Sequence, residues 1–289
     1  MAGVAIQDIR RHIRSVQSIE HITNAMRLVS AAKLNRAKAV FERTQGYLHI
    51  VTDCIDELFN NVGDIPSHYV LGKQEIKRTC YIVVTSNRGL AGSFNTNVIK
   101  AAESMMQHGA GDPLLVCVGS KGRDYFLNRG HEVISEYHSP PEDVSFVSTR
   151  EISAPVIDLF DEETVDEIVI VYTEFLSMLE QRVQTKRLLP FEAKINPDAL
   201  QREKQIEYDP SPEAVFNYLI PKYVEIMVYR AIVESATCEH AARRLAMENA
   251  TDNARDMMSE LQLHFNRARQ AAITSEITEI VSGADAVNG

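Results

Sequence analysis

The chain has 289 residues, of which 45% are hydrophobic and 24% are charged. These are the proportions of an ordinary globular protein, and the length suits one large domain or one domain with an extended element. The formal net charge is −10 and the sequence pI is about 5.4, and no signature of an RNA- or DNA-binding module is present. We therefore expect no nucleic-acid partner.

Charge is unevenly distributed along the chain. Residues 1–45 carry eight Lys/Arg and three Asp/Glu, a net of +5, whereas residues 46–221 carry 15 and 27, a net of −12. Residues 222–289 carry seven and ten, a net of −3. A basic first segment and an acidic middle predict different surroundings for these parts of the protein.

The four cysteines, Cys54, Cys80, Cys117 and Cys238, form no CxxC pair and have no histidine at ligand spacing. This argues against a zinc site or a disulfide scaffold and favours a reducing compartment. Cys80 and Cys117 lie in apolar, strand-like runs, where a thiol acts as a small hydrophobic group. No apolar run approaches the roughly 18 residues of a membrane span. We expect no metal and no cofactor.

The N-terminal region predicts one long helix. No proline precedes Pro66, and apolar residues recur at steps of three and four. At 1.5 Å per residue, about 55 residues make a rod of roughly 80 Å, too long for a small domain. The first stripe is Ile6, Ile9, Ile13, Val16, Ile19, Ile22, Met26 and Val29, and the later heptad series are Phe41, Leu48, Ile55 and Thr44, Val51, Leu58.

The C-terminal region repeats this pattern. Ser211 before Pro212 predicts a helix start, Pro221 is expected to break or kink the helix, and Gly283 is its expected stop. Two surface helices of a helical domain are one interpretation. The length of both segments favours the other, an antiparallel coiled coil formed by the two chain ends. Its alanine-rich seam would contain Ala254, Leu261, Ala268 and Met258, Phe265, Ala272.

The middle of the chain predicts a parallel sheet. Strand-like runs at 79–85, 114–118 and 131–137 alternate with helix-like runs at 95–108 and 122–129, which is a βαβαβ order. A further strand is expected at 167–175 and a more exposed one at 181–191. Segments 60–75 and 193–211, rich in Pro, Asn and Asp, would join this domain to the helices.

The predicted fold class is therefore α/β, with a long antiparallel coiled coil of N- and C-terminal helices and a central Rossmann-like α/β domain. The expected boundaries are 1–60 for the N-terminal coiled-coil helix, 75–210 for the Rossmann-like domain and 211–289 for the C-terminal coiled-coil helix.

Two glycine loops follow predicted strands. "TSNRGLAGSFN" (85–95) contains Gly89 and Gly92 but lacks the third glycine of GxGxxG and the Lys-Ser/Thr ending of a Walker loop. "GSKGRD" (119–124) has Lys121 but no hydroxyl partner for magnesium. We interpret both as tight strand-to-helix turns. A Rossmann-type enzyme that uses these loops remains an alternative, although no GxSxG, HExxH or Cys/His constellation is present and no catalytic residue is predicted.

Three stretches resemble the gamma subunit of the rotary F-type ATP synthase, of bacterial type: "IRRHIRSVQSIEHITNAMRLVSAAKLNRA" (9–37), "TSNRGLAGSFN" (85–95) and "EHAARRLAMENATDNARDMMSELQLHFNRARQAAITSEITEIVSGADAV" (239–287). The resemblance implies a non-catalytic central shaft whose coiled coil turns inside a ring of three alpha and three beta subunits. The Rossmann-like domain would be its foot, which binds the epsilon subunit and the c-ring of the membrane rotor.

The resemblance also implies which residues meet beta. Arg269 and Gln270 would contact the catch loop of one beta subunit, with Thr274 nearby, and Arg88 would meet acidic residues at the lower rim of beta. Met26 and Arg243 would also contact beta, and Met26 would lie where the helices pass the lower part of the beta ring, close to Arg243 or Arg244. Simple core packing is the alternative for Met26.

The absence of a transit peptide predicts a bacterial protein, peripheral to the cell membrane on its cytoplasmic side. A chloroplast version should carry a cysteine pair late in the foot, and no cysteine lies between Cys117 and Cys238. A third hypothesis is a coiled-coil scaffold or membrane-surface adaptor that uses the basic N-terminal helix.

Overall fold

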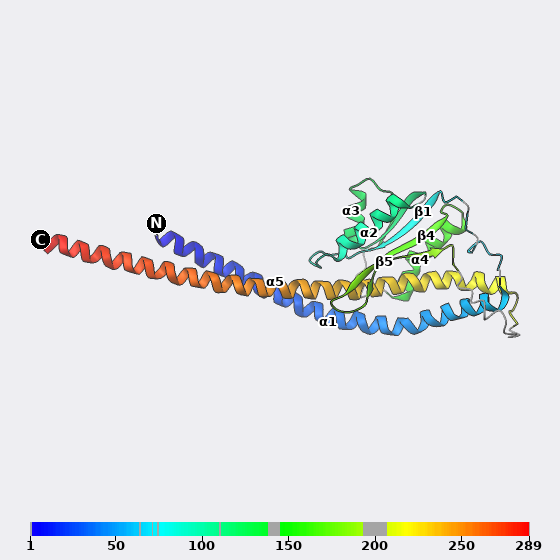
Figure 1. Ribbon diagram of the computed structural model, residues 1–289, viewed down its shortest axis with the longest axis horizontal. Coiled ribbons are helices and arrows are strands. Elements are labelled where there is room, and N and C mark those ends of the chain that lie inside the picture. Colours follow the sequence, from blue (N-terminus) through cyan, green and yellow to red (C-terminus); the bar gives the residue numbers. More distant parts are fainter. Residues whose placement is uncertain are drawn as a thin grey trace. The chain divides into compact units, whose positions relative to one another are not determined.

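The computed structural model describes residues 2–63, 65–70, 72–73, 75–109, 111–137, 145–192 and 207–288. These ranges contain five helices and a five-stranded sheet, whose arrangement can be followed in Figure 1. The chain divides into two compact units, Ala31–Arg243 and Met1–Ser30 with Arg244–Gly289. We call the first the sheet unit and the second the helical-pair unit, and describe each by itself.

The sheet has the strand order β3-β2-β1-β4-β5. The strands β1 (Arg78–Val84), β2 (Asp112–Val118), β3 (Val133–Tyr137) and β4 (Glu167–Phe175) are parallel. The last strand, β5 (Gln181–Leu189), pairs antiparallel with β4 and is the most exposed of the longer strands. The predicted parallel, Rossmann-like order is confirmed.

Both faces of the sheet are covered, which is why the central strands read as unbroken apolar runs. Helices α2 (Phe94–His108) and α3 (Ser120–Leu127) pack on the face of Tyr81, Val83 and Leu115. On the opposite face, α4 (Phe146–Asp161) and the parts of α1 and α5 within the sheet unit form one larger core. Helix α4 was not predicted. Its Pro155 obscures the pattern, although Ser145 caps it by accepting a hydrogen bond from the Ser148 N–H at 3.1 Å.

The two terminal helices are α1 (Ala2–Val62, 61 residues) and α5 (Pro212–Asn288, 77 residues). Pro221 lies inside α5 without ending it, so the expected break is wrong. The helix also continues past Gly283, which corrects the predicted stop, because a glycine in a helix costs only about 1 kcal/mol relative to alanine. Of the predicted linkers, residues 64, 71, 74 and 193–206 lie outside the described part of the chain.

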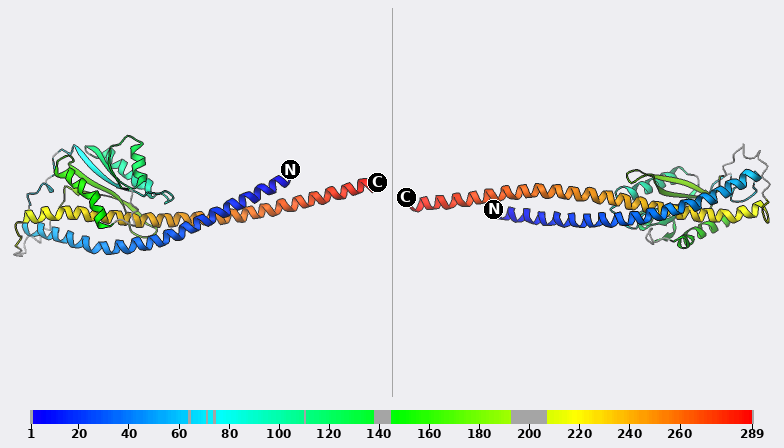
Figure 2. Two further views of the ribbon diagram at one scale, coloured as in Figure 1. Left: turned by 180° about the vertical axis from the view of Figure 1, so that it is seen from behind. Right: turned by 90° about the horizontal axis from the view of Figure 1, so that it is seen from below.

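Within the sheet unit, α1 and α5 run antiparallel. The Phe59 and Phe216 rings meet edge-on at 5.1 Å, and the Arg230 guanidinium lies 6.0 Å from the Phe41 ring centre. The further views of Figure 2 agree that these helix segments lie side by side. The predicted heptad series is confirmed, since all its members are buried: Phe41, Thr44, Leu48, Val51, Ile55 and Leu58.

Within the helical-pair unit, α1 and α5 are again antiparallel. The Arg10 guanidinium lies 5.4 Å from the Phe265 ring centre, and Thr23 is hydrogen-bonded to Thr251. The predicted α5 seam is confirmed: its members are the more protected side chains of that stretch, whereas most of the others are exposed. They are Ala254, Met258, Leu261, Phe265, Ala268 and Ala272.

The predicted α1 stripe is partly wrong. Val16 is buried, but Ile19, Ile22 and Val29 are 49%, 57% and 56% exposed. Three residues turn the helix by about 300°, so each three-residue step moves the next side chain about 60° around the helix. After two such steps from Val16, the apolar side chains no longer face α5. Polar side chains take the vacated positions, and Glu20 and Ser30 are buried there.

Candidate functional site

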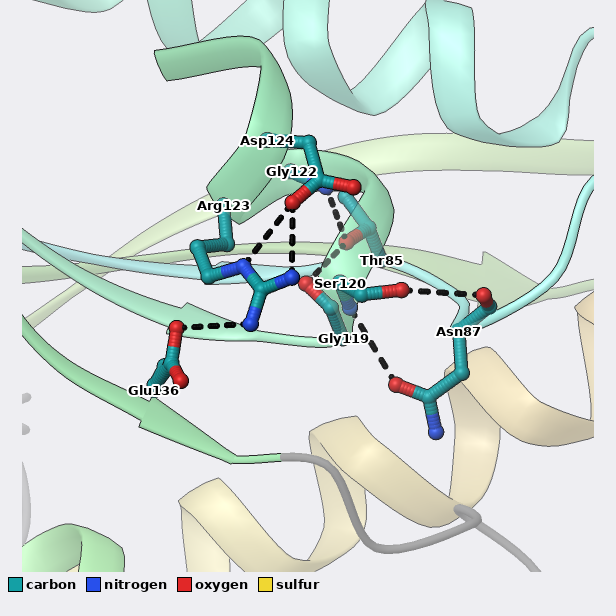
Figure 3. A network of polar contacts seen from close by, with 8 residues as sticks. All are labelled: Thr85, Asn87, Gly119, Ser120, Gly122, Arg123, Asp124 and Glu136. Carbon is teal, nitrogen blue, oxygen red and sulfur yellow. Dashed lines mark hydrogen bonds and ion pairs between the residues drawn. The ribbon is translucent and has the colours of Figure 1, made fainter. Parts of the chain in front are cut away.

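The loop after β1 interlocks with the start of α3. The Ser120 N–H donates to Asn87 Oδ1 at 3.2 Å, and the Lys121 N–H donates to the Ser86 carbonyl at 3.1 Å. The Gly122 N–H donates to Thr85 Oγ1 at 2.9 Å (Figure 3). Phosphate sites at helix starts are built from such N–H groups. Here the protein itself uses these three, so the two glycine loops bind each other.

The glycines of "GSKGRD" are explained by this close approach. Gly119 has φ +95°, and a Cβ there would collide with the Thr85 carbonyl. A Cβ on Gly122 would lie 2.9 Å from Thr85 Oγ1. At the surface beside them, the Arg123 guanidinium bridges Asp124 and Glu136 and so connects α3 to β3 (Figure 3). These residues pack the backbone closely, which is a structural rather than a ligand-binding role.

Helix α5 fills the place where related folds bind nucleotides. In open α/β sheets that place is the crevice at the carboxyl ends of the strands where the strand order reverses, here between β1 and β4. The Ser235 hydroxyl accepts from the Thr173 N–H at 3.1 Å, and the Glu234 carboxylate accepts from the Phe175 N–H at 3.1 Å. Cys238 packs beside them with Ala91, Phe94 and Phe175. A side-chain lock between helix and sheet therefore occupies the crevice.

The buried groups of this lock have altered acidity. Glu234 is 1% exposed, and burial raises its pKa, although the hydrogen bond from the Phe175 N–H and the nearby Arg230 charge oppose this shift.

Two cysteines in the strands are also buried, Cys80 in β1 and Cys117 in β2. Burial raises the pKa of their thiols to about 12. At neutral pH these two thiols are protonated and act as small hydrophobic groups, as the sequence predicts.

Two predicted contact residues, Arg88 and Arg243, come together in the sheet unit. Arg88 is exposed, on the loop after β1. Arg243 is 8% exposed, and its guanidinium pairs with Glu239 at 2.7 Å. It also donates to the carbonyls of Arg88 and Gly89 at 3.1 and 3.3 Å. Arg243 is therefore bound to the chain's own backbone.

The other predicted contacts belong to the helical-pair unit. Arg269, Gln270 and Thr274 are exposed on one stretch of α5, where the Thr274 hydroxyl donates to the Gln270 carbonyl at 2.9 Å. Met26 lies on α1, and its carbonyl accepts from the Ser30 hydroxyl at 2.7 Å. The side chains of Arg269 and Gln270 are thus placed to meet another molecule.

Polar contacts set the register of this pair of helices. Arg255 binds Glu20 at 3.1 Å, and the Thr251 hydroxyl lies 2.9 Å from that of Thr23. Glu20 and Thr251 are both buried. Polar groups at seam positions specify alignment at some cost in stability.

Sequence reasoning missed the exposed apolar side chains of the same unit. On α1 they include Ile19, Ile22 and Val29, and on α5 they include Ile273, Ile277 and Ile280, which are 48–66% exposed. Because Arg10 lies opposite Phe265, the part of α5 beyond about residue 273 extends past the first turn of α1. The sequence signal for this exposure is the slip of the α1 stripe to successive three-residue steps near residues 16–22.

Among the described residues, no cluster of three or more His, Cys, Asp or Glu side chains has a geometry suited to a metal ion. None of the described helices is both long and apolar enough to span a membrane.

Comparison with known proteins gives a consistent result. The sequence model of a protein family described as ATP synthase matches residues 5–287. A protein of Alkaliphilus metalliredigens named ATP synthase gamma chain is 44% identical, over 99% of each chain. One of the same name from Heliobacterium modesticaldum is 41% identical, over 98% of this chain and 99% of its own. The sodium ion specific ATP synthase gamma chain of Acetobacterium woodii is 38% identical over the same shares.

Solved structures share the fold. A chain of the Euglena gracilis mitochondrial ATP synthase superposes with a TM-score of 0.70 at 18% identity, covering 99% of this chain and 95% of its own. A chain from the central stalk and c-ring of the Tetrahymena thermophila mitochondrial ATP synthase gives 0.59 at 23% identity, covering 79% and 99%.

Proposed function

The chain belongs to the ATP synthase gamma chain family, and we propose that its two units carry torque between the partners of that subunit. The gamma subunit is the central shaft of the F1Fo enzyme. It couples rotation of the ion-driven membrane ring to conformational changes at the catalytic sites on beta, in synthesis or hydrolysis of ATP. The chain itself is not catalytic. Its partners are the alpha and beta subunits of the alpha3beta3 ring, the epsilon subunit and the c-ring.

The observation that carries the proposal is the lock between α5 and the sheet. A shaft transmits torque only if its helices are fixed to the domain that is driven. Glu234 and Ser235 of α5 bind the backbone of β4 near its carboxyl end, where a nucleotide would sit in an enzyme of this fold. The same contacts therefore remove a ligand site and attach a helix, which favours the shaft over the alternative of a Rossmann-type enzyme.

The proposed contacts with beta share the work. Changing the nucleotide affinity of a catalytic site by four orders of magnitude takes about 5.5 kcal/mol of differential interaction energy. An exposed ion pair contributes only about 0–1 kcal/mol, so no single contact suffices. We assign direct contacts to Arg88, Arg269, Gln270 and Thr274, and to Met26 where its side chain is uncovered. Arg243 contributes in the way argued below.

The exposed apolar side chains of the helical-pair unit support this sharing. Ile19, Ile22 and Ile277 would each bury further surface against the ring, with an energy that depends on rotor angle. The net charge of +5 on residues 1–45 adds attraction if the facing beta surfaces are acidic.

We place the coiled coil at 1–60 and 211–289, and the foot that binds epsilon and the c-ring at 75–210. As part of the membrane-associated F1Fo complex, the chain would lie on the cytoplasmic side of a bacterial cell membrane.

The test is MgATP hydrolysis by matched alpha and beta subunits, with and without this chain. Sustained turnover and a stable complex only in its presence are the expected results. A chain that neither assembles with alpha and beta nor alters their rate would refute the proposal. Nucleotide titration of the isolated chain is the second measurement, and tight binding there would revive the enzyme alternative.

A further inference from the structure

Arg243 is an unusual arginine on α5 because it is buried and bound to backbone. One guanidinium nitrogen pairs with Glu239, one helical turn earlier, and another donates to the Arg88 and Gly89 carbonyls. Arg243 and Glu239 are 8% and 5% exposed. A buried charge needs such a partner and such hydrogen bonds to be tolerated. The arrangement therefore connects a fixed helix to a loop 154 or more residues away in sequence.

Other contacts hold the residues on either side of the Arg88–Gly89 backbone: Ser120 of α3 binds Asn87, and Ala91 packs beside Cys238. At one end of the loop, the Ser86 N–H donates to Asn95 Oδ1 at 2.9 Å, and the Ser86 hydroxyl donates to the Arg88 carbonyl at 2.6 Å. At the other end, Leu90 and Gly92 take positive φ angles of 62° and 57°. For a leucine this conformation needs support from its surroundings.

The Arg88 carbonyl thus accepts from Ser86 on one side and from Arg243 on the other. Two donors on one carbonyl fix the orientation of that peptide plane. The orientation in turn sets the direction in which the Arg88 side chain leaves the backbone. The Arg243 guanidinium is directed inward, toward the loop backbone and Glu239.

We propose that Arg243 is a positioning residue: with Glu239 it holds the Arg88–Gly89 backbone so that the Arg88 guanidinium is presented to an acidic partner surface. Arg243 does not itself touch the partner, which revises the direct contact expected from sequence. The inference rests on the proposed function only for the identity of that partner, an acidic surface of the catalytic ring. The holding of the loop is a property of this chain alone.

The first experiment is a double-mutant cycle on MgATP hydrolysis by the complex of this chain with matched alpha and beta subunits. Arg88→Ala and Arg243→Gln should each lower turnover by up to about fivefold, the upper limit for an exposed ion pair. The double variant should be no slower than Arg88→Ala, because Arg243 acts through Arg88. The control cycle pairs Arg243→Gln with Arg269→Ala, and there the two effects should multiply.

The second experiment measures loop order in the isolated chain. A nitroxide label is attached at Leu90→Cys, an exposed loop position, in a background with Cys54→Ser. Arg243→Gln should increase the mobility of this label. The same label at Lys100→Cys, exposed on α2, should not respond. If Arg243→Gln fails to fold, Arg243→Lys replaces it, since a compact ammonium group lacks the planar fork that reaches the Glu239 carboxylate and the two carbonyls from separate nitrogens.

The two failures are distinguishable. A label at position 90 that stays equally immobile without Arg243 overturns the inference, whatever the assembled complex does. Equal losses from Arg243→Gln with and without the Arg88 side chain also overturn it, because they indicate direct contact. Unchanged turnover in both the Arg88→Ala and the Arg243→Gln variant overturns the inference as well. A wild-type chain that fails to activate alpha and beta refutes the proposed function, while the label measurement still decides the positioning role.

Discussion

The two units use apolar surface in opposite ways. In the sheet unit, Ile82, Leu115 and Ile170 are fully buried between helices on both faces. In the helical-pair unit, Glu20 and Thr251 occupy the seam while Ile19 and Ile277 face outward. The first unit uses its apolar side chains for its own stability. The second leaves many of them available, which is what a helix pair surrounded by other subunits requires.

The seam residues show why the helical pair is built this way. Ala254, Ala268 and Ala272 allow the helix axes to approach closely but bury little area each, so they contribute little hydrophobic energy. The contacts Glu20–Arg255 and Thr23–Thr251 instead define the alignment of the two helices. Alignment and outward apolar surface are therefore the properties of this unit, and its intrinsic stability should be modest.

The strongest test of this contrast is a large-to-small substitution in each unit. Ile170→Ala removes a fully buried side chain at the centre of the sheet and should lower the free energy of unfolding by about 2–5 kcal/mol. Ile277→Ala, at a position 56% exposed, should change it by no more than about 0.5 kcal/mol. Urea titration of the isolated chain measures both. Similar losses at the two positions would show that the helical-pair unit also stabilises itself with apolar contacts.

A second test concerns the interlocked glycine loops of the sheet unit. Gly119 and Gly130 both have positive φ, but a Cβ on Gly130 enters open space whereas one on Gly119 meets the Thr85 backbone. Gly130→Ala should cost about 1–2 kcal/mol of stability, from backbone strain alone. Gly119→Ala should cost clearly more, because the Thr85 carbonyl must also move. Equal melting temperatures for the two variants would mean that the loops are not packed as described.

Much of this architecture could be predicted from local pattern. The run of apolar residues in β1 and the heptads through Phe41 and Ile55 each specify an element by periodicity alone. Helix α4 was not predicted because Pro155 lies inside it and interrupts the helical pattern of the sequence. The sequence analysis wrongly assigned Ile19 to the contact between α1 and α5. An apolar side chain indicates that a surface is buried in the functional state, but not whether this chain or another subunit buries it.

The site was less predictable than the fold. That Arg88 lies on a loop after a strand follows from the glycines around it. The contact of Arg243 with the Arg88 carbonyl could not be predicted, because the two residues are 155 positions apart and no local sequence pattern relates them. The filled crevice between β1 and β4 was likewise hidden, since Glu234 and Ser235 read in sequence only as polar interruptions of a helix.

The third test addresses the outward surface of the helical-pair unit. Arg269→Ala and Gln270→Ala should each lower steady-state ATPase of the assembled complex by up to about fivefold, because both side chains are exposed and free to meet a partner. The melting temperature of the isolated chain should be unchanged, which separates a weakened interaction with beta from a damaged helix. The nearby exposed Asn266 provides the control as Asn266→Ala. A variant that carries both Arg269→Ala and Gln270→Ala, assembles normally and keeps its turnover would contradict the assignment of these residues to the catch-loop contact.

The smallest expected effect is a pH dependence from the lock on α5. Burial raises the pKa of Glu234 above that of the unfolded chain, with Glu174 adding to the shift and Phe175 and Arg230 opposing it. The native state therefore holds this proton to higher pH than the unfolded state, so stability falls as pH rises from the ordinary glutamate pKa through the raised one.

Glu234→Gln keeps an oxygen to accept the Phe175 N–H but has no proton to lose. Below the ordinary glutamate pKa the variant and the wild type should differ least. Above the raised pKa the variant should be the more stable of the two. Urea titrations from pH 4 to 8 measure this, with exposed Glu260→Gln as the control. A wild-type advantage that grows with pH would mean that the ionised carboxylate stabilises the lock through Arg230, and α5 would then be attached to the sheet unit by a buried ion pair.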